Sequence, residues 1–148
     1  MIFNPEKIKI HNEYSLFHYL HGRCHLFAMA YKEYNNDSEI NALFGVFENE
    51  KYEEEIHIEH VFIKLKDNIY IDASGRKKTL EEIENEYSFN SLETFFGDEE
   101  DYNKWFKYNL EKKYIFDFEE SEKDSLIKFF KKNKYFKKNK FKFNKKKY

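Results

Sequence analysis

The stretch IHIEHVFIKLKDNIYIDA, residues 56–73, predicts a β-hairpin, and with it the fold of the chain. Apolar and polar residues alternate over residues 56–65, which is the period of a half-buried strand. A second short apolar run covers residues 69–73, and Lys66, Asp67 and Asn68 between the two runs supply the turn. We therefore expect two antiparallel strands here.

Further elements are expected on the N-terminal side of this hairpin. The apolar run at residues 40–47 predicts a third strand, and the charged segment 48–55 is expected to be a solvated connection. Residues 15–34 have apolar positions at steps of three and four, the helical period. The simplest interpretation is a turn around His21–Arg23 and a helix from Cys24 to about Tyr34. A continuous helix through Gly22 stays open, at a cost of about 1 kcal/mol for the glycine.

Helices are expected again after the hairpin. Thr79 and Glu82 have the spacing of a capping box at a helix start. Apolar residues between 91 and 110 predict one or two short helices, and Ser121 can cap a last helix that runs into Lys128 and Phe130. The order helix, strands, helices indicates an α+β fold with helices packed on a small antiparallel sheet.

Composition sets the class of protein. The chain has 148 residues, 41% of them hydrophobic and 20% aromatic, which is enough for one domain with a real core. A single cysteine excludes an internal disulfide, so a cytoplasmic location is the expectation. We expect no transmembrane segment, because no apolar run approaches the ~20 residues that a spanning helix needs. The first residues lack the pattern of a signal peptide.

Charge divides the chain into an acidic body and a basic tail. Residues 1–127 contain 15 Lys or Arg and all 28 Asp or Glu, a net charge of −13, and are expected to form the single domain. Residues 128–148 contain 11 Lys and no acid, interleaved with aromatic residues, and are expected to form a helix end and tail. Lys131–Lys147 could contact a polyanion such as nucleic acid or an anionic membrane, or fold back on the acidic body. A solvated tail without a task is the alternative.

Cys24, His60 and Asp72 are the residues that could carry chemistry. A cysteine at a helix start is favoured as thiolate by the helix dipole, and the first N–H groups can stabilise an oxyanion. Histidine would accept the cysteine proton, and aspartate would orient the imidazole. A two-residue turn at Asp67-Asn68 sets residue 63 opposite residue 72. His60 is then diagonal to Asp72, so a bulge or a different register is needed.

Three segments carry a family resemblance: GRCHLFA at residues 22–28, HVF at 60–62 and YIDASG at 70–75. Together they resemble the papain-like cysteine hydrolase superfamily, in particular its small NlpC/P60-like and transglutaminase-like domains of phage and bacterial type. The resemblance covers about half of the chain, roughly residues 20–76. It implies a papain-like core, with Cys24 as nucleophile, His60 as base and Asp72 as orienter of a catalytic triad.

The same resemblance implies a reaction class and shows one departure. It implies thiol-dependent hydrolysis, deamidation or transfer at an amide, isopeptide or ester of a protein or peptide-like substrate, without a cofactor or metal. Papain-like enzymes place a polar oxyanion side chain a few residues before the cysteine, commonly glutamine. Here the candidates are His18 and His21, and Gly22 and Arg23 are the other residues expected to lie beside the substrate.

Other functions remain open at this point. Zinc could bind His21, Cys24, His25 and a strand histidine, although residues 57 and 60 of one strand point to opposite sides. The chain could instead be a small phage or mobile-element protein that binds and inhibits a host factor without catalysis. It could also be a nucleic-acid-associated protein that acts through its basic tail.

Overall fold

Helices and two antiparallel sheets make up residues 4–88, 92–133 and 136, the part of the chain that this computed structural model describes. The elements follow in the order η1 (a 3-10 helix, Pro5–Lys7), β1 (Lys9–His11), β2 (Tyr14–Ser15), α1 (Leu16–Leu20), α2 (Cys24–Tyr34), β3 (Glu39–Glu48), β4 (Glu54–Lys66), β5 (Ile69–Ile71), α3 (Leu80–Tyr87), β6 (Glu93–Gly97), α4 (Glu99–Glu111) and α5 (Glu122–Lys132). The α+β class expected from the sequence is confirmed.

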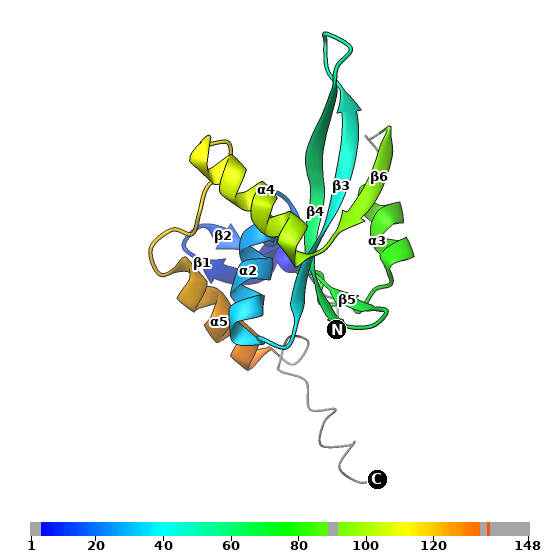
Figure 1. Cartoon of the computed structure of the whole chain (residues 1–148). Helices are drawn as coiled ribbons and strands as arrows, with labels where there is room; N and C mark the ends of the chain where they lie inside the picture. The colour runs from blue at the N-terminus through cyan, green and yellow to red at the C-terminus, as the bar shows by residue number, and fades with distance from the viewer. Residues whose placement is uncertain (1–3, 89–91, 134–135, 137–148) are drawn as a thin grey trace.

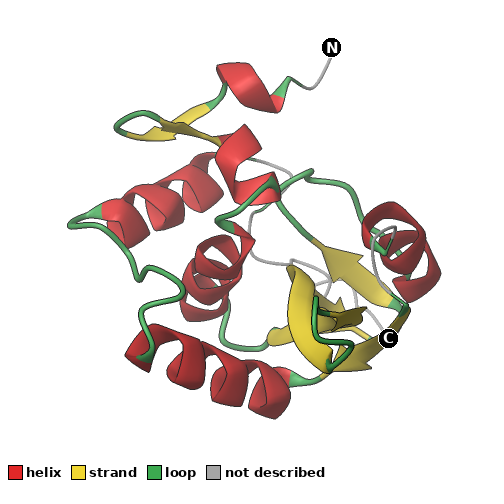
Figure 2. Ribbon diagram, turned by 90° about the horizontal axis from the view of Figure 1, so that it is seen from above, coloured by secondary structure: helices red, strands yellow, loops and turns green. Residues whose placement is uncertain are grey.

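The main sheet has four strands in the order β5-β4-β3-β6, and every neighbouring pair is antiparallel. β3 and β4 form a long hairpin whose tip projects beyond the other elements (Figure 1). Helices α2, α4 and α5 lie on one side of this sheet, and α3 lies on the other (Figure 2). The strands predicted at 40–47, 56–65 and 69–73 are therefore present, with small changes at their ends.

Both faces of the central strands are buried, so the sheet separates two cores. The larger core joins α2, α4 and α5 to Ala42, Val61 and Ile63, and the smaller core joins Leu43 and Phe62 to α3. Successive side chains of a strand point to opposite faces. This double burial explains why β3 is apolar at nearly every position from Ile40 to Phe47, with Asn41 as the exception, rather than alternating.

The segment that leads into Cys24 forms as expected. α1 ends at Leu20, and α2 begins at Cys24 after a turn in which Gly22 adopts φ +101°. A Cβ on Gly22 would meet no atom within 4 Å, so the backbone conformation, not close packing, requires glycine here. The capping box at Thr79 and Glu82 also forms, with both reciprocal bonds.

The expectation of only short helices between residues 91 and 110 is wrong for its first half. Residues 93–97 form strand β6, which pairs with β3, and only α4 is helical. Aromatic residues favour a strand when a partner edge is available, and Phe95 stacks on Phe44 with 5.3 Å between ring centroids. The partner edge is remote in sequence, which is why local periodicity missed it.

The end of the described chain belongs to the larger core. Phe130 and Phe136 are fully buried, and both rings contact Phe27, with centroids 5.1 and 5.5 Å away. The expected domain limit at residue 127 thus falls inside α5. Ser121 precedes α5 as expected, but its side chain makes no capping bond.

Two expectations from the sequence concern partners: a polyanion contact through the basic tail, and the absence of a transmembrane segment. Most of the Lys131–Lys147 segment, residues 134–135 and 137–147, lies outside the described residues, so the polyanion contact stays a prediction. None of the helices in the described part of the chain has the length and apolar character needed to cross a membrane.

Candidate active site

Cys24 is the first residue of α2 and is partly exposed. Arg23 is the N-cap residue, and its side chain makes no capping bond. The first N–H groups of a helix have no acceptor within that helix and carry the positive end of its dipole. A sulfur at this position therefore lies beside donors that suit a thiolate or a developing oxyanion.

His60 and Asp72 form a buried hydrogen-bonded pair. Nε2 of His60 lies 2.9 Å from Oδ2 of Asp72, and the two side chains are only 1% and 2% exposed. His60 comes from the middle of β4, and Asp72 directly follows β5. The pairing predicted from the sequence is thus present in the structure.

A β-bulge makes this pair possible. β4 and β5 pair Lys64 with Tyr70 and Lys66 with Ile69, so Leu65 is an extra residue in β4. The bulge sets Ile63 opposite residue 71 rather than 72, and Asp72 then falls on the same face as His60. Without it the register would slip by one residue, and Asp72 would point to the opposite face.

A second bulge lies at the histidine itself. His60 pairs with Leu43, whereas Ile58 pairs with Phe44, so Glu59 is an extra residue of β4 in its ladder with β3. Bulges re-aim a side chain and often occur beside functional sites. This one reverses the alternation between Ile58 and His60, so that Ile58 packs on the larger core. His60 shares the face of Phe62 toward the smaller core, where its ring stacks on Tyr87 with 3.7 Å between centroids.

Asp72 is held by further donors that sequence reasoning missed. Its Oδ2 accepts bonds from Nζ of Lys78 (3.0 Å) and from the hydroxyl of Tyr87 (3.3 Å). Its Oδ1 accepts the N–H of Ser74 at 2.9 Å. Lys78 is buried and also donates to Glu86 at 2.6 Å. The only sequence signal was that Tyr87 falls on the apolar face of α3, four residues after the buried Ile83.

The site is charged at neutral pH. Burial lowers the pKa of His60, but hydrogen bonds with Asp72 and Cys24 outweigh it and raise the pKa to about 9. Burial opposes ionisation of Asp72 as well, yet its contact with His60 and the charge of Lys78 hold the pKa of the carboxyl well below its usual range. His60 thus pairs as an imidazolium with the carboxylate of Asp72, and its charge also interacts with Cys24.

The other residues expected beside the substrate have mixed placements. Arg23 donates from two nitrogens to the buried Glu122 (2.6 and 3.0 Å). His18 accepts the N–H of Ser15 at 3.0 Å, which fixes the start of α1. His21 is exposed and contacts Phe17, with 4.5 Å between ring centroids. Through these contacts Arg23 joins α2 to α5 and His18 caps α1. His21 and Gly22 lie on the surface before Cys24.

Tyr102 of α4 is an additional polar group near the cysteine. Its side chain is fully buried, and its hydroxyl has no hydrogen-bond partner among the described residues. Its ring lies next to Trp105 and Phe106, which both contact the ring of His25, the residue after Cys24. Burial and then the charge of Cys24 raise the pKa of Tyr102. No local sequence pattern marks this residue.

The histidines considered for zinc have other contacts. Nε2 of His25 lies 3.1 Å from the carbonyl oxygen of Phe116, and His57 lies beside Glu55 on the exposed hairpin. Within the part of the chain that the structure describes, no three His, Cys, Asp or Glu side chains are grouped so that they could hold a metal ion.

Comparisons of the chain with protein-family models, with curated proteins and with solved structures find no match. Assignment of a function therefore depends on the geometry of the residues around Cys24.

Proposed function

We propose that the chain catalyses cysteine-dependent acyl chemistry at an amide, isopeptide or ester bond. The observation that carries the proposal is the buried His60–Asp72 pair, brought to one face by a bulge, together with the position of Cys24 at a helix start. The electrostatic interaction of His60 with Cys24 is consistent with it. The resemblance of residues 20–76 to papain-like, NlpC/P60-like and transglutaminase-like domains supports the same reaction class.

Each residue has a role that follows from its position. The thiolate of Cys24 adds to the carbonyl carbon, and the electron pair of the C=O bond moves to oxygen. The first N–H groups of α2 are donors available to that oxyanion. We assign the same role to the hydroxyl of Tyr102, because it is buried without a partner among the described residues and its charge would interact with that of Cys24. The His60 imidazolium gives its proton to the leaving amine or alcohol as the C–N or C–O bond breaks. Asp72 keeps the imidazole oriented.

The second half of the reaction regenerates the cysteine. A thioester remains on Cys24, and His60, now neutral, takes a proton from the attacking water or amine as its oxygen or nitrogen bonds to the carbonyl carbon. The C–S bond then breaks, which returns the thiolate of Cys24 beside the imidazolium of His60. Water gives hydrolysis or, with a side-chain amide substrate, deamidation, whereas an amine gives transfer. A protein or peptide-like substrate in the cytoplasm suits this chemistry, since a free thiol persists in a reducing compartment.

Acylation of Cys24 by p-nitrophenyl acetate tests the proposal. We expect wild-type protein to release about one equivalent of p-nitrophenolate in a burst, as acyl-enzyme accumulates. Intact mass and peptide mapping should locate the acetyl group on Cys24. The Cys24→Ser variant should keep the fold and lose the burst. Wild-type protein that reacts no faster than unfolded chain would rule the proposal out.

A further inference from the structure

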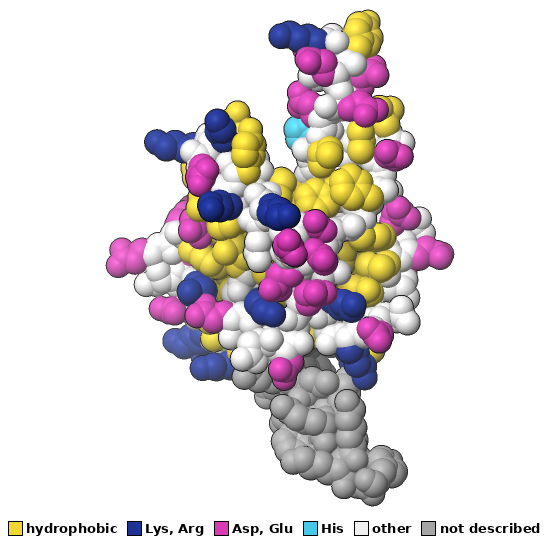
Figure 3. Space-filling model, in the orientation of Figure 1, with side chains coloured by type: hydrophobic (Ala, Val, Ile, Leu, Met, Phe, Trp, Pro, Cys, Tyr) yellow, Lys and Arg dark blue, Asp and Glu magenta, His cyan; other side chains and the backbone are white. Residues whose placement is uncertain are grey.

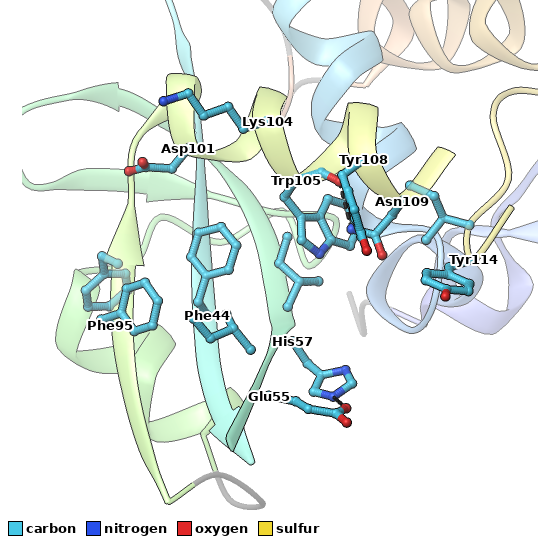
Figure 4. A pocket seen from close by; sticks show the side chains of 14 residues that line it. Phe44, Glu55, His57, Phe95, Asp101, Lys104, Trp105, Tyr108, Asn109 and Tyr114 are labelled. Carbon is cyan, nitrogen blue, oxygen red and sulfur yellow. Dashed lines mark hydrogen bonds and ion pairs between the residues drawn. The ribbon is translucent and has the colours of Figure 1, made fainter. Parts of the chain in front are cut away.

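A groove of about 1010 Å³ separates the β3–β4 hairpin from α4. Figure 3 shows the hollow between these elements, and Figure 4 shows the side chains that line it. Most of them are aromatic or aliphatic, and three large apolar side chains are well exposed: Ile56 (59%), Tyr108 (56%) and Tyr114 (70%). Exposed apolar side chains gathered in one place mark a binding surface.

The groove crosses the sheet from Phe95 of β6 past Phe44 of β3 and reaches the backbone edge of β4. The consecutive residues 55–58 all line it, although their side chains alternate between the two faces of the sheet. β5 pairs with β4 only between Ile63 and Lys66. Among the described residues, no strand pairs with residues 54–58 on that side of β4. The N–H and C=O groups of this edge are thus available to an added strand.

This edge leads to the candidate active site. His60 follows two residues after Ile58 in β4, and Asp72 follows the last residue of β5 on the same side of β4. Trp105 lines the groove and contacts the ring of His25, which is next to Cys24. A chain laid along the open edge would continue the line of β5 toward His60 and Asp72.

The charge of the groove indicates what kind of chain binds. The hairpin segment 48–59 contains six glutamates and one lysine. Within the groove, Glu55 and Asp101 outnumber Lys104. Acidic side chains are also prominent along the hairpin and near the start of α4 in Figure 3. Positive side chains are the complement of such a surface.

From these observations we infer that the groove binds an extended segment of another polypeptide, one that alternates apolar with lysine or arginine residues. The segment adds to the sheet as a strand along residues 54–58, with apolar side chains on the aromatic wall and basic side chains toward Glu54 and Glu55. The inference rests on the proposed function only for the fate of the bound segment, which presents an amide to Cys24.

Fluorescence anisotropy with a labelled peptide of alternating lysine and valine tests this inference. The Cys24→Ser background prevents turnover. Binding should weaken as salt rises, and a glutamate–valine peptide should bind far more weakly. Ile56→Lys places a charge on the open edge and should lower affinity about tenfold or more. Leu92→Lys is the matched control, because Leu92 is as exposed (67%) but does not line the groove, and it should leave affinity unchanged.

The outcomes separate this inference from the proposed function. The Ile56→Lys change in otherwise wild-type protein should leave acylation by p-nitrophenyl acetate intact, because that ester is too small to need the groove. Peptide binding lost only in Ile56→Lys supports the groove even if Cys24 proves inert. Equal affinity in Ile56→Lys and Leu92→Lys, or no binding, overturns the inference. A dimer in sedimentation that Ile56→Lys dissociates, without peptide binding, also overturns it and assigns the edge to a second copy.

Discussion

At the scale of single residues, the site depends on how each buried polar group is satisfied. Asp72 accepts bonds from His60, Lys78, Tyr87 and the N–H of Ser74, so its charge is fully compensated. Buried charges are stable only when they are paired and hydrogen-bonded in this way. The hydroxyl of Tyr102 is the contrast, since it is buried without a partner in the described part of the chain.

Tyr102 and Tyr19 are both buried, but only the hydroxyl of Tyr19 has a hydrogen-bond partner among the described residues. Tyr102→Phe should slow acylation of Cys24 by about 10²-fold, because an oxyanion donor is lost. It should leave alkylation by iodoacetamide unchanged, because that displacement forms no oxyanion. Stability should stay equal or rise, since an unsatisfied hydroxyl is removed. Denaturant titration and the two rate constants provide the measurements.

Tyr19→Phe is the control for that prediction. Tyr19 is equally buried, but its hydroxyl donates to Glu122 at 2.6 Å. Its removal should cost about 1–3 kcal/mol, because a buried carboxylate loses a donor. If Tyr102→Phe lowers the free energy of unfolding to a similar extent, the Tyr102 hydroxyl stabilises the fold. The proposal that it donates to an oxyanion would then be wrong.

At the scale of elements, much of the fold was predictable from sequence, but the strand registers were not. The start of α2 and the β4–β5 hairpin follow from local period and turn residues. The bulge at Leu65 does not, because register depends on which face each strand buries. β6, Lys78, Tyr87 and Tyr102 were missed for a related reason. Their partners lie far away in the sequence or on other elements.

The contact between α5 and the start of α2 supports the position of Cys24. Glu122 is fully buried and accepts bonds from Tyr19, from two nitrogens of Arg23 and from the N–H of Glu119. Glu122→Gln removes the charge at nearly constant shape and leaves the Arg23 guanidinium without its counter-ion. We expect a loss of about 3 kcal/mol in the free energy of unfolding and slower acylation of Cys24, whose N-cap neighbour loses its anchor.

Glu120→Gln is the matched control, since Glu120 is exposed in the loop before the same helix. It should change the free energy of unfolding by less than about 0.5 kcal/mol. Equal stability of the two variants, measured by urea titration, would show that the Glu122 contact does not hold the two helices together.

At the scale of the whole molecule, the charged pair links folding to pH. The pKa of His60 is raised to about 9 in the folded chain, above the ~6.5 of an unfolded histidine. Its contribution to stability is therefore complete below pH 6.5 and is lost as pH rises through 9. His25, whose pKa burial lowers, acts only below about pH 6.5 and in the opposite sense.

We therefore expect the free energy of unfolding of Cys24→Ser, which has no thiol that titrates in the same range, to fall between pH 6.5 and 10. His60→Gln in that background should flatten this part of the profile. Chemical denaturation at graded pH in both proteins provides the measurement. A Cys24→Ser profile as flat as that of the double variant would mean that His60 is neutral in the folded chain.

The most direct test of the central claim is the pH profile of Cys24 alkylation by iodoacetamide, in wild-type protein and in His60→Gln. An ordinary thiol, with pKa about 8.5, loses reactivity steeply below that pH. With an imidazolium beside the sulfur, the wild-type rate should persist to markedly lower pH, and the variant should return to the profile of an ordinary thiol. Superimposable profiles of the two folded proteins would contradict the claim that His60 and Asp72 activate Cys24.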